Sequence, residues 1–326
     1  QVDAFNAYTA GCGHAFATSA GFPKAWRDRR AFICGPTGNL LGMYDIRHKD
    51  SGYEANNAFS FMASADEWFS PVVAEVGPDG NLWVADWYNF IIQHNPTPNK
   101  SRAGYDAKNG QGNAHINPNR DRQHGRIYRV IWDSAPKSKI KTLAKAGPRK
   151  LVKALDSDNL FWRQTAQRLI VDGDNKKAAK ALRERALGQG VGAIHALWAL
   201  DGLGELDEET KRAALINTDA EVKRNAVRAL GQAKDDEQLL YDSATLADKD
   251  LHVRLAAIVK LAQFPDSDTH KRAAGVLAKD KTNAEDEWLK LALQAAGAEE
   301  TNVIGYERGP NLFANASFEK NNGKLP

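Results

Sequence analysis

Hydrophobic and polar positions follow different spacings in the two halves of the chain. In residues 1–148, short apolar and aromatic runs are broken by clusters of Gly, Pro, Asn and Asp, a pattern typical of strands and tight turns. In residues 149–300, Ala and Leu recur at helical spacing, and Leu251, Leu255 and Ile258 form one stripe of a helix. The sequence therefore predicts a β region followed by an α region.

The clearest strand pair lies around a turn at Gly77–Gly80. Val72–Val76 predicts the first strand and Asn81–Ala85 predicts the returning strand. Pro78 presets φ in the turn and Gly80 accepts a positive φ, so we expect the two strands to form a hairpin.

Two further segments repeat this pattern less clearly. Residues 30–44 predict a hairpin around Gly35–Gly38, and Gly125–Trp132 predicts a last strand. Short antiparallel hairpins at this spacing are typical of propeller blades, which take about 40–50 residues each. Residues 1–133 are therefore expected to form a partial β-propeller of roughly three C-terminal blades, with a small β-sandwich as the alternative.

The helical half repeats at intervals of 29 to 36 residues. The polar residues that this period aligns are Arg163, His195, Arg224, Arg254 and Lys290. The expected N-terminal caps of three of these helices are Asp158, Asp219 and Asp250. A helical period near 30 residues predicts stacked helix pairs, that is, an α-solenoid.

The predicted fold class is a multidomain β + α protein. The partial propeller (1–133) is followed by a short basic linker (134–148), the α-solenoid (149–300) and the start of a further β domain (301–326). The chain begins at Gln1 without Met and stops soon after a new motif begins. We therefore expect a piece of a longer polypeptide. This piece is expected to be inactive on its own, because roughly three blades leave an unpaired strand edge and half a pocket.

Composition excludes several classes of protein. The 326 residues are 42% hydrophobic and 26% charged, as in globular proteins, and no apolar run approaches the ~18 residues of a membrane helix. The net charge of +3, without basic residues interleaved with aromatics, argues against a nucleic-acid partner. Cys12 and Cys34 are too few for a disulfide scaffold or a four-cysteine zinc site, and they form either one bridge or two buried thiols.

A set of motifs in one order carries a family resemblance. The motifs are Cys12–Phe16, Phe22-Pro23, Phe32–Asn39, Ser64–Pro71, Glu75–Asn89, Gln93–Pro98 and His124–Val130. Together they resemble a family of membrane-bound dehydrogenases of planctomycete- and verrucomicrobial-type bacteria. The propeller of that family is similar to the quinoprotein glucose/sorbosone dehydrogenases, and its members often continue into HEAT-like repeats.

The resemblance implies an activity and a location. It implies oxidation of a sugar or alcohol with pyrroloquinoline quinone, often with calcium, in a periplasmic or cell-surface protein. The segment Asn311–Glu319 is similar to the opening strand of a carbohydrate-binding jelly-roll module, and no Cys-x-x-Cys-His haem motif occurs. Activity inferred from such a likeness is analogy at the level of the fold.

The first candidate site follows the strand Asn81–Ala85. Asp86 can bind calcium or act as a base, and Trp87, Tyr88 and Asn89 offer aromatic and amide groups to a quinone or a sugar ring. The alternative is a structural role, in which Asp86 accepts hydrogen bonds from turn amides.

Two histidines are candidate proton acceptors, His14 and the loop residue His94, because imidazole titrates near neutral pH. A structural hydrogen-bonded role is the alternative for each. Asp66 and Glu67 are adjacent, so their side chains diverge on a strand and do not form an acid/base pair.

Residues 100–129 hold seven basic and two acidic residues. Arg120, Arg122 and Arg126 are the candidates for gripping the carboxylates of a quinone cofactor. A solvated loop is the alternative.

The helical half shows no metal-ligand spacing and no nucleophile constellation. Gly188–Gly192 is not preceded by a strand, which excludes a dinucleotide fingerprint, and we expect packing or surface roles for His195 and His252. The predicted function is part of a quinone-dependent sugar or alcohol dehydrogenase joined to an interaction scaffold. The alternative is a non-catalytic protein that binds a protein or polysaccharide at the cell envelope.

Overall fold

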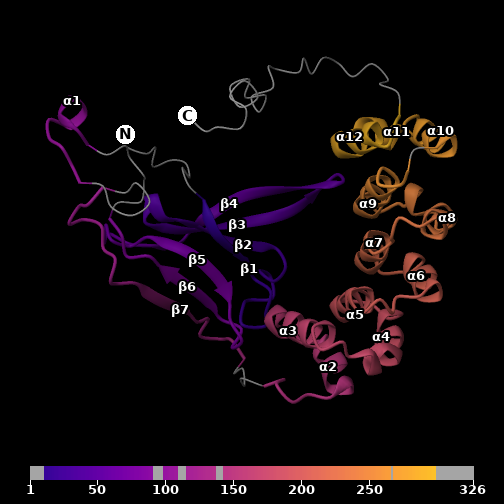
Figure 1. Cartoon of the computed structure of the whole chain (residues 1–326), viewed down its shortest axis with the longest axis horizontal. Helices are drawn as coiled ribbons and strands as arrows, with labels where there is room; N and C mark the ends of the chain where they lie inside the picture. The colour runs from indigo at the N-terminus through magenta and orange to yellow at the C-terminus, as the bar shows by residue number, and fades with distance from the viewer. Residues whose placement is uncertain (1–10, 91–97, 109–114, 137–141, 266, 299–326) are drawn as a thin grey trace.

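Two structural parts lie side by side in the chain, a β module and a curved row of helices (Figure 1). The computed structural model describes residues 11–90, 98–108, 115–136, 142–265 and 267–298. The candidate His94 and the predicted β segment at 301–326 lie outside these described residues.

The first sheet of the β module has four antiparallel strands in sequential order. The strands are β1 (Cys12–Phe16), β2 (Arg30–Gly35), β3 (Leu40–Lys49) and β4 (Gly52–Ala63). The predicted turn between β2 and β3 is confirmed, with Asn39 in the left-handed region at φ 53°. β3 and β4 form the longest hairpin, which extends beyond the sheet toward the helices (Figure 1).

The second sheet has three antiparallel strands, β5 (Pro71–Val76), β6 (Leu82–Asp86) and β7 (Arg126–Val130). The predicted β5–β6 hairpin is confirmed, and Gly80 has the positive φ of 80° that its turn requires. The connection from β6 to β7 carries the short helix α1 (Lys100–Ala103). β7 lies within the strand predicted at 125–132.

The two sheets share one apolar core, which includes Phe32, Leu41, Met43 and Leu82. β1 packs against β5 so closely that a Cβ atom on Gly13 would lie 2.2 Å from the Val72 carbonyl oxygen. Glycine at position 13 therefore allows the contact between the sheets.

The predicted partial propeller is wrong. The described residues form two small sheets of four and three strands, and neither is closed into a barrel or arranged as a propeller. Alternating polarity and turn residues determine local hairpins. How many sheets pack together, and around what axis, depends on contacts between distant residues such as Gly13 and Val72, which that pattern does not encode.

The helices form two layers (Figure 1). The layer nearer the β module contains α3 (Leu160–Val171), α5 (Val191–Gly202), α7 (Ala220–Arg228), α9 (Leu251–Leu261) and α12 (Glu287–Ala295). The other helices are α2 (Pro148–Ala154), α4 (Ala179–Ala186), α6 (Glu208–Leu215), α8 (Lys234–Asp242), α10 (Asp268–Leu277) and α11 (Lys281–Glu285). Buried Leu, Ala, Ile and Val side chains form one continuous core between the layers.

The five positions that the sequence period aligns lie one on each helix of the inner layer. Asp219 and Asp250 cap α7 and α9, each accepting hydrogen bonds from two backbone amides. The cap predicted at Asp158 is wrong, because the side chain of Asn159 caps α3 by accepting from the Phe161 amide. Asn159 directly precedes the first helical residue, which is the position a cap requires.

The row of helices contacts the β module first through α3. The side chain of Asn159 donates to the Gly77 carbonyl oxygen at 2.9 Å, and the indole of Trp162 donates to the Pro78 carbonyl oxygen at 2.9 Å. The backbone amide of Leu160 donates to the Thr18 carbonyl oxygen at 3.0 Å. The start of α3 is therefore attached to the β5–β6 turn and to the chain after β1.

A second contact lies at the other end of the row. The tip of the β3–β4 hairpin, residues 49–53 and called the hairpin tip below, reaches His252 of α9 and the Asp286 cap of α12. The buried Ser51 donates to the Asp286 carboxylate from its amide at 2.8 Å and from its hydroxyl at 2.6 Å. Nε2 of His252 donates to the Gly52 carbonyl oxygen at 2.9 Å. The β module therefore touches the helices at both ends of the row.

A hydrogen-bonded network joins α3 to α5. Nε of Arg163 donates to Nε2 of His195 at 3.3 Å, and Nδ1 of His195 donates to the Gln167 side-chain oxygen at 2.6 Å. This arrangement needs a neutral imidazole, because Nε2 accepts. Burial, helped by the positive charge of Arg163, lowers the pKa of His195 to about 4.

His195 makes the free energy of unfolding depend on pH. The unfolded chain binds a proton at His195 near pH 6.5 and the folded chain only near pH 4, so stability is lost as the pH falls through this window. We expect His195→Gln to reduce the loss between pH 7 and pH 5 by about 2 kcal/mol relative to the unmodified chain. Urea unfolding at each pH measures how the free energy of unfolding of the two proteins changes with pH. An equal change in both proteins would contradict the lowered pKa of His195.

The hairpin tip depends on Ser51. We expect Ser51→Ala to lower the free energy of unfolding by about 1.5–3 kcal/mol, because it removes a hydrogen bond to a buried carboxylate. Ser60→Ala is the matched control, since Ser60 is an exposed residue of the same hairpin. Urea unfolding compares the two variants, and equal losses would show that the contact does not stabilise the chain.

Candidate functional site

The candidates at the end of β6 come together around Asp86. Its carboxylate is fully buried and accepts from the Ser70 amide at 2.7 Å, the Tyr88 amide at 2.9 Å and Nε of Arg126 at 2.6 Å. Tyr88 itself adopts the left-handed conformation at φ 53°. Asp86 therefore makes the hydrogen bonds to turn amides that its structural alternative predicts.

Arg126 of β7 joins two loops. Its Nη1 donates to the Asp66 carboxylate at 2.7 Å, in addition to the Nε bond to Asp86. Partial burial opposes the charge of Arg126, but the hydrogen bonds to Asp66 and Asp86 outweigh it and raise the pKa of the guanidinium. The same bond, followed by the Trp68 amide, lowers the pKa of Asp66. The guanidinium therefore stays charged and paired within the protein.

The aromatic candidates of this cluster are covered in part. The ring of Tyr88 stacks on Trp68 with centroids 5.3 Å apart, and the Arg126 guanidinium lies 4.5 Å from the Tyr88 ring centroid. The buried side chain of Asn89 donates to the Asp121 carbonyl oxygen at 3.1 Å. Trp87 is 41% exposed.

The cluster does not fit the implied cofactors. Both carboxylate oxygens of Asp86 already accept protein hydrogen bonds, and the adjacent Arg126 cation repels a calcium ion. A quinone needs a free aromatic face and a free cation. Here the Arg126 guanidinium packs on the Tyr88 ring and is itself ion-paired with Asp66 and Asp86. Among the residues that the structure describes, no group of three His, Cys, Asp or Glu side chains is placed to hold a metal ion.

The remaining candidates lie apart from this cluster or have structural partners. Arg122 is exposed, and the backbone amide of Arg120 donates to the Asn117 carbonyl oxygen at 3.0 Å. Cys12 and Cys34 are free thiols on β1 and β2, and burial, followed by the nearby Cys12, raises the pKa of Cys34 to about 12. A thiol with so high a pKa is a poor nucleophile.

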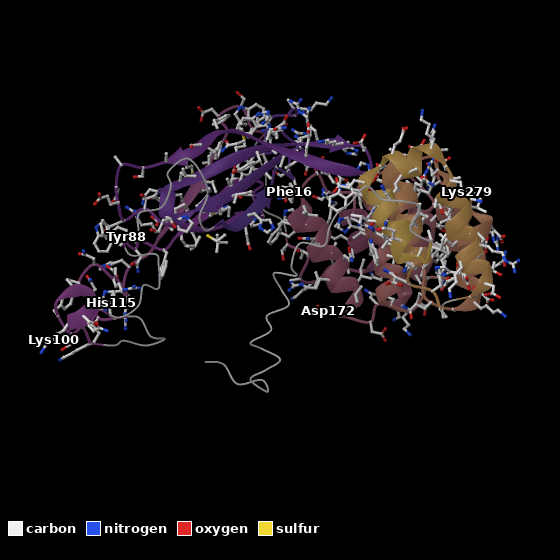
Figure 2. The ribbon with its side chains drawn as sticks, turned by 90° about the horizontal axis from the view of Figure 1, so that it is seen from above. Phe16, Tyr88, Lys100, His115, Asp172 and Lys279 are labelled. Carbon is white, nitrogen blue, oxygen red and sulfur yellow. The ribbon has the colours of Figure 1, made fainter. Side chains whose placement is uncertain are left out.

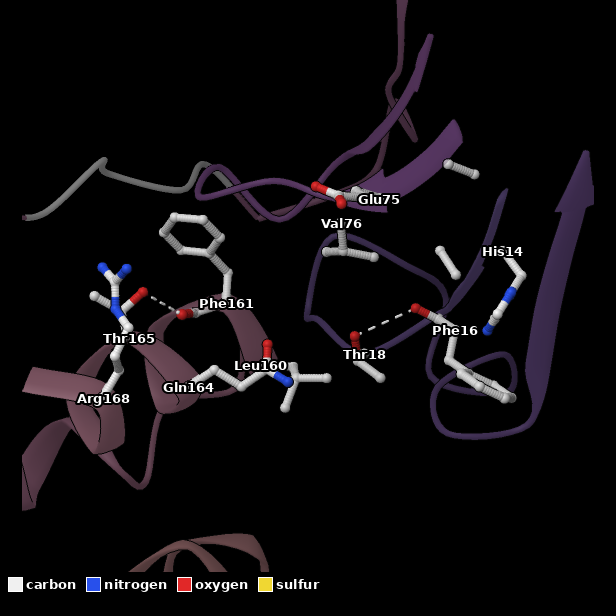
Figure 3. Close-up of a pocket in the computed structure, with 12 residues that line it drawn as sticks. His14, Phe16, Thr18, Glu75, Val76, Leu160, Phe161, Gln164, Thr165 and Arg168 are labelled. Carbon is white, nitrogen blue, oxygen red and sulfur yellow. Dashed lines mark hydrogen bonds between the residues drawn. The ribbon is translucent and has the colours of Figure 1, made fainter. Parts of the chain in front are cut away.

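His14 lies in a different place, a pocket of about 550 Å³ where the β module meets α3 (Figure 3). Its lining includes His14 and Phe16 of β1, Glu75 and Val76 of β5, and Phe161, Gln164 and Arg168 of α3. We call this cavity the junction pocket. Figure 2 shows Phe16 on the side of the β module toward the helices, far along the module from Tyr88.

Local structure determines which side chains reach the junction pocket. In β1, His14 and Phe16 alternate with the buried Ala15, so both lie on the face of the strand away from the core. In α3, Phe161, Gln164 and Arg168 follow one another at spacings of three and four, so they share one face of the helix.

The polar side chains of the junction pocket are uncommitted. Within the described part of the chain, the side chains of His14, Glu75, Gln164 and Arg168 make no hydrogen bond or ion pair. The rings of Phe16 and Phe161 are 47% and 37% exposed. The hydroxyls of Thr18 and Thr165 donate to the Phe16 and Phe161 carbonyl oxygens, drawn as dashed lines in Figure 3.

The junction pocket combines two aromatic rings with one acid, one guanidinium, one imidazole and one amide. Its volume lies within the range of ligand pockets in proteins, about 300–1,000 Å³. Of its residues, the sequence analysis identified only His14. The stripe of Phe161, Gln164 and Arg168 was visible in the sequence as an aromatic and polar face at the start of the first long helix.

Comparison with known protein families finds a match for the first part of the chain. Residues 1–134 match a family described as a domain of unknown function, DUF7133. No curated protein matches the chain significantly. Each helix within the described ranges is too short or too polar to cross a membrane.

Asp86 provides a test of the structural assignment. We expect Asp86→Asn to lower the free energy of unfolding by about 2–3 kcal/mol, because it leaves Arg126 partly buried without its closest counter-charge. Asp133→Asn, at an exposed residue without an ion pair in the described structure, is the control and should change stability by less than about 0.5 kcal/mol. Thermal unfolding measures both, and a neutral effect at Asp86 would contradict its structural role.

Proposed function

We propose that this chain is a non-catalytic binding protein that holds a sugar unit of a polysaccharide in the junction pocket. The observation that carries the proposal is the set of uncommitted groups in that pocket: His14, Glu75, Gln164 and Arg168 beside the exposed rings of Phe16 and Phe161.

A sugar ring matches this lining chemically. The C–H face of a sugar is apolar and packs on a flat aromatic ring, whereas its hydroxyl groups both donate and accept hydrogen bonds. Glu75 accepts, Arg168 donates, and Gln164 and His14 do both. Figure 3 shows His14 and Phe16 on one side of the pocket and Phe161 and Arg168 on the other, so a ligand between them contacts both parts of the protein.

The contact between α3 and the β5–β6 turn supports a preformed site. Asn159 and Trp162 anchor α3 to the β5–β6 turn through three carbonyl contacts to Gly77 and Pro78. These bonds hold the α3 face opposite β1 before any ligand arrives. Preorganisation of this kind reduces the entropy lost on binding.

The resemblance noted in the sequence supports a sugar as ligand. Oxidation of a sugar or alcohol with pyrroloquinoline quinone and calcium stays a prediction from that resemblance, as does a periplasmic or cell-surface location. The cluster at Asp86 does not support oxidation, because its acid and its cation are paired with each other. A protein partner on the row of helices is a further prediction, without a contact that supports it.

Binding of oligosaccharides tests the proposal. Isothermal titration calorimetry with cello-, xylo-, manno- and galacto-oligosaccharides and oligogalacturonate should identify a ligand. We expect Phe161→Ala to weaken its binding about three- to tenfold through loss of one stacking face. Arg168→Gln should weaken it further where the ligand is acidic.

Phe59→Ala is the matched control for Phe161→Ala. Phe59 is an exposed ring on β4 that does not line the junction pocket, so its loss should leave binding unchanged. Equal effects of the two variants, or no binding of any of these sugars, would remove the support for a sugar site.

A further inference from the structure

A second pocket of about 610 Å³ lies at the opposite joint, between the hairpin tip and the helices α7, α9 and α12. Three cationic residues line it: Arg224 and Arg228, one turn apart on α7, and Lys260 on α9. Neither Asp nor Glu is among its lining residues. The lining itself is therefore cationic, which attracts an anion, and the Glu221 and Asp286 carboxylates lie next to it, bonded to Arg224 and Ser51.

The three cations differ in how many hydrogen bonds and ion pairs they make within the protein. Lys260 is buried and donates from Nζ to the Leu230 carbonyl oxygen at 2.7 Å. Arg224 is paired with Glu221 and donates from Nη1 to the Tyr53 hydroxyl at 2.9 Å, while its buried Nε has no hydrogen-bond partner. Arg228 is exposed and its side chain makes no ion pair or hydrogen bond in the described structure. All N–H groups of the Arg228 guanidinium are thus available to a ligand.

Aromatic rings lie beside these cations. Tyr53 of the hairpin tip and Trp288 of α12 line the pocket, and each side chain is 52% exposed. His252 lies against Tyr53 with ring centroids 4.7 Å apart, and its Nε2 is committed to the Gly52 carbonyl oxygen. Exposed rings in the same pocket as the unpaired guanidinium of Arg228 suit a ligand with a flat face and an anionic group.

We propose that this cationic pocket binds a small ligand in which a phosphate, sulfate or carboxylate group is attached to a ring. Arg228 binds the anionic group, assisted by the positive field of Arg224 and Lys260, and the ring packs against Tyr53 or Trp288. Arg donates two parallel N–H groups, so it recognises all three oxyanions through the same geometry. The site is separate from the junction pocket and does not depend on the proposed function.

Four phenyl compounds serve as probes of the unmodified chain. Phenyl phosphate, phenyl sulfate and benzoate share one ring and differ in the anion, and phenol is the neutral reference. Isothermal titration calorimetry should detect binding of at least one anion and at least tenfold weaker binding of phenol. Raising the salt concentration should weaken binding of the anions, because salt screens the interaction between exposed charges. The compound that binds most tightly among the three anions identifies the anionic group that the pocket prefers.

Arg228→Gln is the decisive variant. Loss of a hydrogen bond between charged groups corresponds to roughly ten- to a hundredfold weaker binding. Arg272→Gln on α10 is the matched control, because Arg272 is also exposed and unpaired in the described structure but lies outside the pocket, and it should leave binding unchanged. Trp288→Phe should alter the tryptophan fluorescence change that accompanies binding.

Two results overturn the proposal: equal binding of phenol and the anions, or equal affinity of the Arg228→Gln and Arg272→Gln variants. Absence of binding by all three anions at low salt overturns it as well. Phe161→Ala should leave phenyl-anion binding intact and Arg228→Gln should leave sugar binding intact, so failure at one pocket is distinguishable from failure at the other.

Discussion

The buried hydrogen bonds between Ser51 and Asp286 hold the two parts of the chain in one arrangement. They join residues 235 positions apart, and Asp286 also caps α12 by accepting from the Leu289 amide. Burial alone would raise the pKa of Asp286, but the hydrogen bonds from Ser51, Leu289 and Trp288 lower it, so the carboxylate stays charged. The approach also needs Gly52, where a Cβ atom would lie 2.6 Å from Nε1 of Trp288. One carboxylate thus serves the helix and the hairpin together.

This contact gives the helical row a second attachment, opposite the one through Asn159 and Trp162. Each pocket lies where the β module and the helices meet: the junction pocket at α3 and the cationic pocket at the hairpin tip. Neither part of the chain forms either pocket alone. A helical row attached only through α3 would keep the junction pocket and lose the cationic pocket.

The sequence was informative where structure is local. The β5–β6 turn and the caps at Asp219 and Asp250 follow from residues a few positions apart, and all are confirmed. The propeller was wrong, because sheet packing depends on distant close approaches such as that of Gly13 to Val72. The cationic pocket was missed for the same reason: Tyr53 and Arg224 are 171 residues apart, and no periodicity connects a hairpin tip to a helix.

The difference between Asp86 and the two pockets lies in how polar groups are satisfied. Asp86 and Arg126 stand beside aromatic rings at a strand end, as a catalytic pair does, yet every polar contact of Asp86 is made within the protein. In a buried setting such saturation stabilises the fold and leaves no carboxylate oxygen of Asp86 without a hydrogen-bond partner. His14, Arg168 and Arg228 are less conspicuous in the sequence, but their hydrogen-bonding capacity is unused in the described structure. Unused polar capacity in a concave site with aromatic walls, rather than residue type alone, distinguishes surfaces suited to binding from those that maintain the fold.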